Sequence, residues 1–205
     1  MLLKYDYWYF TSVISSEQCD AIVLKYLKQK SKKAITGTES KKLKSKSKLN
    51  KKDLLDLKKT RNSSIVWITD VKVKNMIEPY INSANTDSGW NFEVDQAESI
   101  QFTHYGKNQH YDWHFDCWDT PYPNGRVRKL SAIVSLSDPK SYKGGNLEFQ
   151  LFNPKTGEVK IVKCNQIKPK GSVVVFPSFL RHRVTPVTKG FRNSLVMWTT
   201  GFPFK

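Results

Sequence analysis

The chain has 205 residues and a formal net charge of +16, with 39% hydrophobic and 13% aromatic residues, which suits one domain with a buried core or one domain with small additions. No run of about 18 apolar residues occurs, and the aromatic N-terminus carries Lys4 and Asp6, so we expect an intracellular, cytoplasmic protein without a membrane span or signal peptide. Cys19, Cys117 and Cys164 are widely spaced and odd in number, which argues against a disulfide framework or a thiolate zinc site.

The first predicted element is an α-helix over residues 16–28. Ser15 and Gln18 have the spacing of a capping box, in which each side chain bonds to the backbone N–H of the other residue. Apolar residues then follow at helical spacing, namely Cys19, Ile22, Val23, Tyr26 and Leu27. The pattern predicts a helix that buries one stripe of its surface.

Most of the positive charge lies in one low-complexity segment, residues 28–61, which holds 13 lysines and Arg61 against three acidic residues. Like charges at this density repel each other, and few apolar side chains are present for burial. We therefore interpret residues 28–61 as a basic insert in the form of a mobile loop or a solvated helical hairpin. Two roles stay open: a solubilising insert, which charge runs favour, and a contact with nucleic acid or another acidic partner.

A strand over residues 64–68 and a second helix are predicted after the insert. Asp70 is placed to cap this helix at its N-terminus. Apolar residues repeat at helical spacing at Val73, Met76, Ile77, Tyr80, Ile81 and Ala84. Pro79 lies inside the pattern, so we expect it to kink the helix or to split it in two.

From residue 90 onward the sequence changes to short segments of strand character, separated by turn signals such as Asn124-Gly125 and Gly144-Gly145. The predicted strands are residues 90–94, 99–105, 110–116, 129–136, 146–152, 158–162, 172–176, 182–187 and 194–200. Helices followed by a run of strands predict a mostly β protein of the α+β class, a sandwich or jelly roll with N-terminal helices packed on one face. We expect a single domain over residues 1–205 whose jelly-roll core spans residues 90–202.

Two histidines and an aspartate in this β region have the composition of a metal site. His114 and Asp116 are two residues apart on a predicted strand and therefore project from the same face. His182 follows a strongly apolar strand, and a facing strand would bring it to the pair. Two imidazoles and one carboxylate hold Fe(II) on one face and leave the other face for a co-substrate and O2. The same set also suits a tetrahedral zinc ion with one open position.

Arg192 favours the iron site. Its guanidinium is a planar fork that pairs with a carboxylate, and no acidic residue lies close to it in the sequence. A dicarboxylate co-substrate would place one end on Arg192 and the other end, with its keto oxygen, on the metal. Ser194, two residues along the same strand, could add a hydroxyl to that carboxylate, and Tyr105 could donate a phenol hydrogen bond to the co-substrate.

Taken singly, each of these residues has an ordinary structural explanation, and only their combination and order in a β region indicate a site. We interpret His104 and His110 as non-ligands, because His104 is out of phase and His110 only begins the strand of His114. The aromatic residues Tyr111, Trp113 and Trp118 are interpreted as core residues or as the wall of a pocket.

Six segments carry a resemblance to a known family. They are Gln101-Phe-Thr-His-Tyr105, Tyr111-Asp-Trp-His-Phe-Asp116, Leu136-Ser-Asp-Pro139, Tyr142-Lys-Gly-Gly145-Asn-Leu147, Phe176-Pro-Ser178 and His182-Arg-Val-Thr-Pro-Val-Thr-Lys-Gly-Phe-Arg192. With these segments, residues 64–202 resemble the Fe(II)/2-oxoglutarate oxygenases of the prolyl 4-hydroxylase-like group, especially the bacterial and phage PKHD-type hydroxylases. Residues 28–61 have no counterpart in this resemblance.

The resemblance implies a role for each candidate residue. His114, Asp116 and His182 would bind iron, Arg192 would hold the distal carboxylate of 2-oxoglutarate, and Tyr105 would contact that co-substrate. The implied fold is a double-stranded β-helix. The implied reaction consumes O2 and 2-oxoglutarate, releases succinate and CO2, and hydroxylates a C–H bond of a protein or peptide side chain, with proline as the first choice. L-ascorbate as a further cofactor and a phage or viral origin are both compatible with it.

Two other functions are weighed against this one. A nucleic-acid demethylase of the AlkB type is encouraged by the charge, but that family requires a second arginine six residues after Arg192, where this chain has Trp198. A non-catalytic binding module with the same fold is disfavoured, because the three ligands and the arginine are present together.

Overall fold

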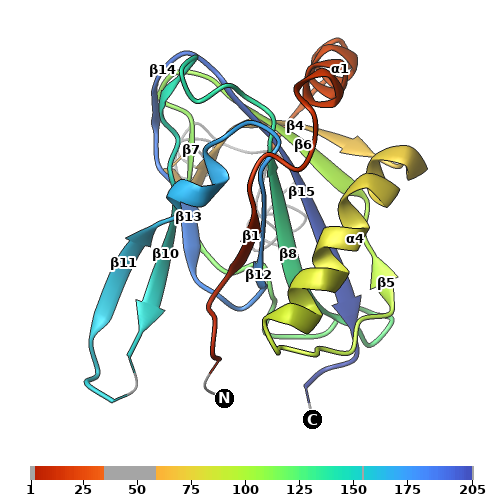
Figure 1. Cartoon of the computed structure of the whole chain (residues 1–205), viewed down its shortest axis with the longest axis vertical. Coiled ribbons are helices and arrows are strands. Elements are labelled where there is room, and N and C mark those ends of the chain that lie inside the picture. Colours follow the sequence, from red (N-terminus) through yellow and green to blue (C-terminus); the bar gives the residue numbers. More distant parts are fainter. Residues whose placement is uncertain (1–2, 35–58, 154, 205) are drawn as a thin grey trace, which may run out of the picture.

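The computed structural model of the chain describes residues 3–34, 59–153 and 155–204 (Figure 1). The helices are α1 (Ser16–Leu27), α4 (Val71–Asp87) and the short 3-10 helix η1 (Asn165–Ile167). The strands are β1 (Trp8–Phe10), β2 (Lys32–Lys33), β3 (Arg61–Asn62), β4 (Ser64–Ile68), β5 (Gln96–Ala97), β6 (Ile100–Tyr105), β7 (His110–His114), β8 (Val127–Ser135), β9 (Lys143–Gly144), β10 (Leu147–Phe152), β11 (Val159–Lys163), β12 (Val173–Pro177), β13 (His182–Val184), β14 (Val187–Lys189) and β15 (Arg192–Gly201). The described chain is mostly β, as predicted.

Two antiparallel sheets dominate the structure. The eight-stranded sheet has the order β1-β12-β8-β15-β6-β4-β2, and β5 pairs with β15 in addition. The five-stranded sheet has the order β11-β10-β13-β7-β3, and β14 and β9 form a separate two-stranded sheet. Figure 1 shows α4 lying along the larger sheet, while the β10–β11 hairpin extends away from the rest of the molecule.

The larger sheet has an apolar cluster on each face, because alternate residues of a strand point to opposite sides. Leu130, Ala132 and Val134 of β8 belong to the cluster that includes the buried residues of α1 and α4. Ile133 of the same strand belongs to the second cluster, together with Phe149 of β10. The second cluster therefore lies between the two sheets, and the residues of the candidate site come from the strands around it.

Both predicted helices are present, with one difference. The Ser15–Gln18 capping box forms, and Asp70 caps α4 by accepting a hydrogen bond from the backbone N–H of Lys72. α4 continues through Pro79 and is not split in two. Pro79 and Asn75, whose carbonyl loses its helical partner, both lie on the exposed side of the helix, where water can replace the missing bond.

The strand predicted over residues 90–94 is wrong. Its alternation of buried and exposed residues is real, since Trp90 and Phe92 are buried, but no strand pairs with this segment. The amide of Asn85 satisfies the backbone instead: its oxygen accepts from Phe92 N and its nitrogen donates to Phe92 O, both at 2.9 Å. Asn91 has a positive φ of 49°, which breaks an extended path. The predicted strand over residues 182–187 is divided into β13 and β14.

The basic insert falls largely outside the described residues, so the predicted loop or hairpin over residues 35–58 is not described by the structure. Both described ends of the insert form short strands: Lys32–Lys33, which are exposed, pair with β4, and Arg61–Asn62 pair with β7. Arg61 is only 7% exposed, although it follows a run of lysines in the sequence. Neither α1 nor α4 combines the length and apolarity that a membrane crossing requires.

Candidate functional site

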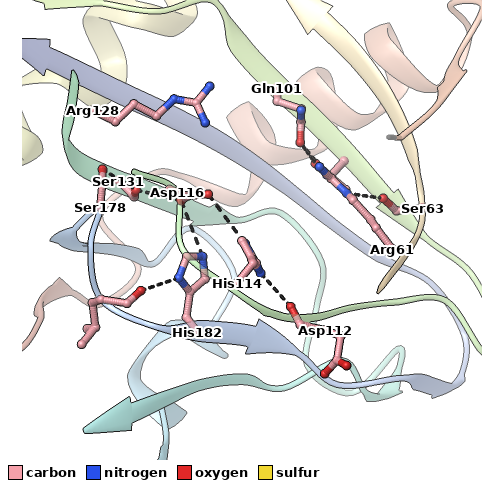
Figure 2. Close-up of polar contacts among 12 residues, drawn as sticks. Arg61, Ser63, Gln101, Asp112, His114, Asp116, Arg128, Ser131, Ser178 and His182 are labelled. Carbon is pink, nitrogen blue, oxygen red and sulfur yellow. Dashed lines mark hydrogen bonds and ion pairs between the residues drawn. The ribbon is translucent and has the colours of Figure 1, made fainter. Parts of the chain in front are cut away.

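His114, Asp116 and His182 meet in one cluster. Their potential ligand atoms all lie within 4.8 Å of one another. The Asp116 carboxylate approaches both imidazoles, with Oδ1 at 3.6 Å from Nε2 of His114 and Oδ2 at 3.5 Å from Nε2 of His182 (Figure 2). The side chains of Asp116 and His182 are buried and that of His114 is 11% exposed.

A β-bulge brings Tyr111 to the same side of the sheet as the two histidines. In the pairing of β7 with β13, His114 lies opposite His182, but Tyr111 lies opposite Val184, so β7 has one extra residue between these positions. On a regular strand, residues three positions apart face opposite sides. Here Tyr111 and His114 share a side, and their rings stack with centroids 3.4 Å apart.

Asp116 reaches the cluster from beyond the end of its strand. We predicted Asp116 on the same strand as His114, but β7 ends at His114. The backbone N–H groups of Asp116 and Cys117 both donate to the carbonyl of Ser178, at 2.9 Å each. Ser131 then donates its hydroxyl to Asp116 Oδ2 at 2.8 Å, and its oxygen is 2.9 Å from the hydroxyl of Ser178. These contacts hold the Asp116 carboxylate in the cluster, although Asp116 itself is not part of a strand.

The second nitrogen of each imidazole contacts a backbone carbonyl. Nδ1 of His114 is 2.7 Å from Asp112 O, and Nδ1 of His182 is 2.8 Å from Leu180 O. A carbonyl only accepts hydrogen bonds, so in each neutral ring the proton is on Nδ1 and the lone pair is on Nε2. Both lone pairs therefore belong to the nitrogens nearest Asp116, which is the arrangement typical of metal-ligating histidines.

Burial and neighbouring charges set the protonation of the cluster. Burial, and then the adjacent His182, lowers the pKa of the His114 imidazole to about 3. Burial alone would raise the pKa of Asp116, but charge interactions with His182, His114 and Arg128 outweigh it and lower that pKa to about 2. At neutral pH, His114 is neutral and Asp116 is ionised, which are the forms that bind a metal ion.

Arg192 is buried on β15, in the larger sheet. It is 3% exposed, its Nη1 donates to Ser194 Oγ at 3.1 Å, and its Cζ is 5.5 Å from the ring centroid of Tyr105, its partner across β6. No acidic side chain pairs with it in the described part of the chain. Gly145 makes room for it, since a Cβ there would lie 2.9 Å from Cδ of Arg192.

Two further arginines near the triad were missed by the sequence argument. Arg61 donates from Nε to Ser63 Oγ at 3.1 Å and from Nη2 to Gln101 Oε1 at 2.6 Å (Figure 2). Arg128 forms two hydrogen bonds to the carboxylate of Glu98, at 2.7 and 2.6 Å. The available signal for Arg61 was that it is the single arginine in a run of lysines.

The other histidines and the aromatic residues named from the sequence are not members of the triad. His104 is bonded to Asn193 and stacked on Phe191, and His110 contacts the carbonyl of Lys59, so neither belongs to the triad. Tyr111 forms a wall of the cluster through its stack on His114. Trp113 lies under the guanidinium of Arg183, and Trp118 contacts Tyr122.

Comparison with known proteins identifies sequence relatives of this region. Residues 100–200 match the family model described as the 2OG-Fe(II) oxygenase superfamily. The PKHD-type hydroxylase YbiX of Escherichia coli O1:K1 / APEC is 39% identical over 99 residues, which is 47% of this chain and 40% of the relative. The homologous protein of Escherichia fergusonii matches to the same extent. The matched region is thus less than half the length of these curated relatives.

Solved structures share the fold over nearly the whole chain. The viral collagen prolyl hydroxylase vCPH from Paramecium Bursaria Chlorella virus-1, in its 2OG complex, has a TM-score of 0.59 and 19% identity, covering 97% of each chain. A Pseudomonas putida prolyl-4-hydroxylase has a TM-score of 0.62 and 17% identity, covering 96% of this chain and 93% of its own. A Trichoplax adhaerens prolyl hydroxylase, in complex with a hypoxia inducible factor peptide fragment, has a TM-score of 0.61 and 16% identity, covering 96% of this chain and 84% of its own.

Proposed function

We propose that this chain, whose residues 100–200 match the 2OG-Fe(II) oxygenase superfamily, is an Fe(II)- and 2-oxoglutarate-dependent dioxygenase. Its reaction would convert 2-oxoglutarate, O2 and a C–H bond into succinate, CO2 and a hydroxylated product. The observation that carries the proposal is the triad of His114, Asp116 and His182, with both Nε2 atoms directed at one ionised carboxylate.

The donor set fits iron. Two imidazole nitrogens and one carboxylate are the ligands of the non-haem Fe(II) centres that keep open coordination positions. We assign His114, Asp116 and His182 as the three ligands. Fe(II), when bound, would supply the activation of O2 that the protein's own side chains cannot provide. Zinc has the same donor preferences, so the choice of iron rests on the match of residues 100–200 to the 2OG-Fe(II) oxygenase family model.

Arg192 fits the co-substrate. A buried guanidinium without an acidic partner is costly, and a carboxylate of 2-oxoglutarate would compensate it. We assign Arg192 to the distal carboxylate, Ser194 to the orientation of the Arg192 fork, and Tyr105 to a hydroxyl contact with the co-substrate. In this arrangement the protein binds one end of the co-substrate through charge and leaves the other end to the metal.

The fold and the substrate class are assigned with the same proposal. We take the two facing sheets as a double-stranded β-helix, or jelly roll, over residues 90–202, within a single domain that spans residues 1–205. The solved neighbours, which are prolyl hydroxylases, support a protein or peptide substrate, with a prolyl side chain as the first candidate.

The direct test is the formation of succinate. We expect the full chain, supplied with Fe(II), 2-oxoglutarate and O2, to release succinate slowly without substrate and faster with a peptide substrate. Mass spectrometry of that peptide should show one added oxygen. Omission of Fe(II), or its replacement by Zn(II), serves as the control. Failure to form any succinate above the metal-free control would contradict the proposed function.

Ser131 provides a prediction about the metal site. Its hydroxyl orients Asp116, so Ser131→Ala should weaken Mn(II) binding, measured by calorimetry, by about tenfold to a hundredfold. The matched control is Ser83→Ala, because Ser83 also donates to an aspartate, Asp87, at 2.6 Å on the exposed side of α4. Equal Mn(II) affinities in the two variants would show that Ser131 does not position the ligand.

A further inference from the structure

Arg61 is a buried cation with neutral partners. Arg61 is 7% exposed, and it donates hydrogen bonds to the hydroxyl of Ser63 and to the amide oxygen of Gln101. A guanidinium has five N–H donors, and these bonds use two of them. In the described part of the chain no carboxylate lies within ion-pair distance of Arg61, so its charge is not compensated by the protein residues described here.

The amide of Gln101 holds the guanidinium in place without neutralising it. Its oxygen accepts from Arg61 at 2.6 Å and from the hydroxyl of Thr103 at 3.2 Å. A glutamate at this position would give Arg61 the partner that Glu98 gives Arg128. Arg128 is therefore neutralised by a carboxylate of the protein, whereas Arg61 is held by a neutral amide and keeps its positive charge.

Arg61 also lies close to the triad. Its Cζ lies 4.3 Å from the ring centroid of Tyr111, and that ring stacks on the metal-ligand candidate His114 at 3.4 Å. One aromatic ring thus separates the cation from the triad. Figure 2 shows the guanidinium of Arg61 directed toward Gln101. Gln101 lies on β6, the strand that also carries Tyr105.

When the charges of the proposed complex are paired, the positive charge of Arg61 has no counter-charge among the described residues. A divalent ion and Asp116 together carry one positive charge, which one carboxylate of 2-oxoglutarate neutralises. Arg192 neutralises the other carboxylate, and Glu98 neutralises Arg128. A buried charge that stays unpaired is strongly unfavourable, and no described carboxylate pairs with Arg61, so a further anion beside Tyr111 would stabilise it.

We propose that Arg61, oriented by Ser63 and Gln101, binds a carboxylate of the substrate close to the carbon that is hydroxylated. The inference rests on the proposed dioxygenase function and narrows its substrate to a peptide or amino acid with a negative charge near the reacting residue. Two sources supply that chemistry, a C-terminal carboxylate and an acidic side chain next to the target residue.

Two matched pairs of probes separate these sources. N-acetyl-L-proline is compared with N-acetyl-L-prolinamide, and N-acetyl-L-aspartyl-L-prolinamide is compared with its asparaginyl equivalent. Binding is measured by calorimetry to the full chain loaded with Mn(II) and 2-oxoglutarate in the absence of O2, so that no turnover occurs. A hydrogen bond to a charged group contributes about 1.5–3 kcal/mol, so the acid of one pair should bind about tenfold to a hundredfold more tightly than its amide.

Two variants test whether Arg61 causes the preference for the acid over the amide. Both Arg61→Gln and Gln101→Glu should remove the preference for the acid, the first by deleting the cation and the second by neutralising it in place. Gln101→Glu keeps the Arg61 side chain over Tyr111, so its loss of preference cannot come from a missing side chain. The control is Arg183→Gln, which changes an arginine already paired with Glu148 and should keep the preference.

The outcomes are distinct. Equal affinities for acid and amide in both pairs, or no binding of either acid, would overturn the inference, as would a preference that persists in Arg61→Gln. A loss of 2-oxoglutarate affinity in Arg61→Gln as large as that in Arg192→Ala would move Arg61 to the co-substrate site and also overturn it. The dioxygenase function fails separately, through the absence of succinate, because the probe measurement requires no catalysis.

Discussion

Asp116→Ala and His182→Ala are each expected to abolish 2-oxoglutarate turnover. Removal of a residue that only supports a metal ligand costs about tenfold to a hundredfold in affinity or activity, and loss of the ligand itself should exceed that range. The two variants leave only two of the three donor atoms that lie within 4.8 Å of one another. Succinate release under saturating 2-oxoglutarate measures the activity, and calorimetry with Mn(II) measures metal binding.

The control for these variants is His104→Ala. His104 is a partly buried histidine of the larger sheet that contacts Asn193 and Phe191 and lies outside the triad. It should retain both metal binding and turnover. Turnover that survives in Asp116→Ala or His182→Ala, at the level of the His104 variant, would exclude the triad as the metal site.

Arg192→Ala is expected to raise the concentration of 2-oxoglutarate needed for half-maximal turnover by about tenfold to a hundredfold. The reason is the loss of a charge-assisted, bidentate contact to the distal carboxylate, worth about 1.5–3 kcal/mol. The requirement for Fe(II) should change far less, since the arginine contacts Ser194 and Tyr105 and none of the triad residues. Titrations of both components in the succinate assay give the two values.

A conservative variant tests the same residue more finely. Arg192→Lys keeps the charge but offers a compact ammonium in place of the planar fork, so it should lie between the wild type and Arg192→Ala. Thermal unfolding of both variants checks that the cluster around Gly145 and Tyr105 is intact. Parallel increases in the requirements for 2-oxoglutarate and Fe(II) would count against a role on the co-substrate alone.

The sequence predicted the members of the site better than their geometry. His114, Asp116 and His182 lie together as expected, and the sequence could suggest this because few residue types suit a metal. The prediction that Asp116 lies on a strand was wrong, because its position depends on Ser131 of β8 and on Ser178 in the turn after β12. Hydrogen bonds between residues far apart in the chain leave no local pattern.

The same limit applies to the prediction of the fold from the sequence. Segments with strong local signals, such as the capping box at Ser15 and the strand Ser64–Ile68, appear where they were predicted. The pattern at Trp90 and Phe92 was read as a strand, since alternation records burial and does not record pairing. Arg61 was assigned to a solvated run by its neighbours in sequence, whereas its burial depends on Gln101 and Tyr111.

The extra residue in β7 has a consequence for how this centre can vary among related chains. Deletion of one residue between Tyr111 and His114 would leave them two positions apart, so regular pairing with β13 would still place both rings on one face. A homologue can therefore present the same stacked pair from a shorter strand without a bulge. A search for related centres should accept both spacings of the aromatic residue and the histidine.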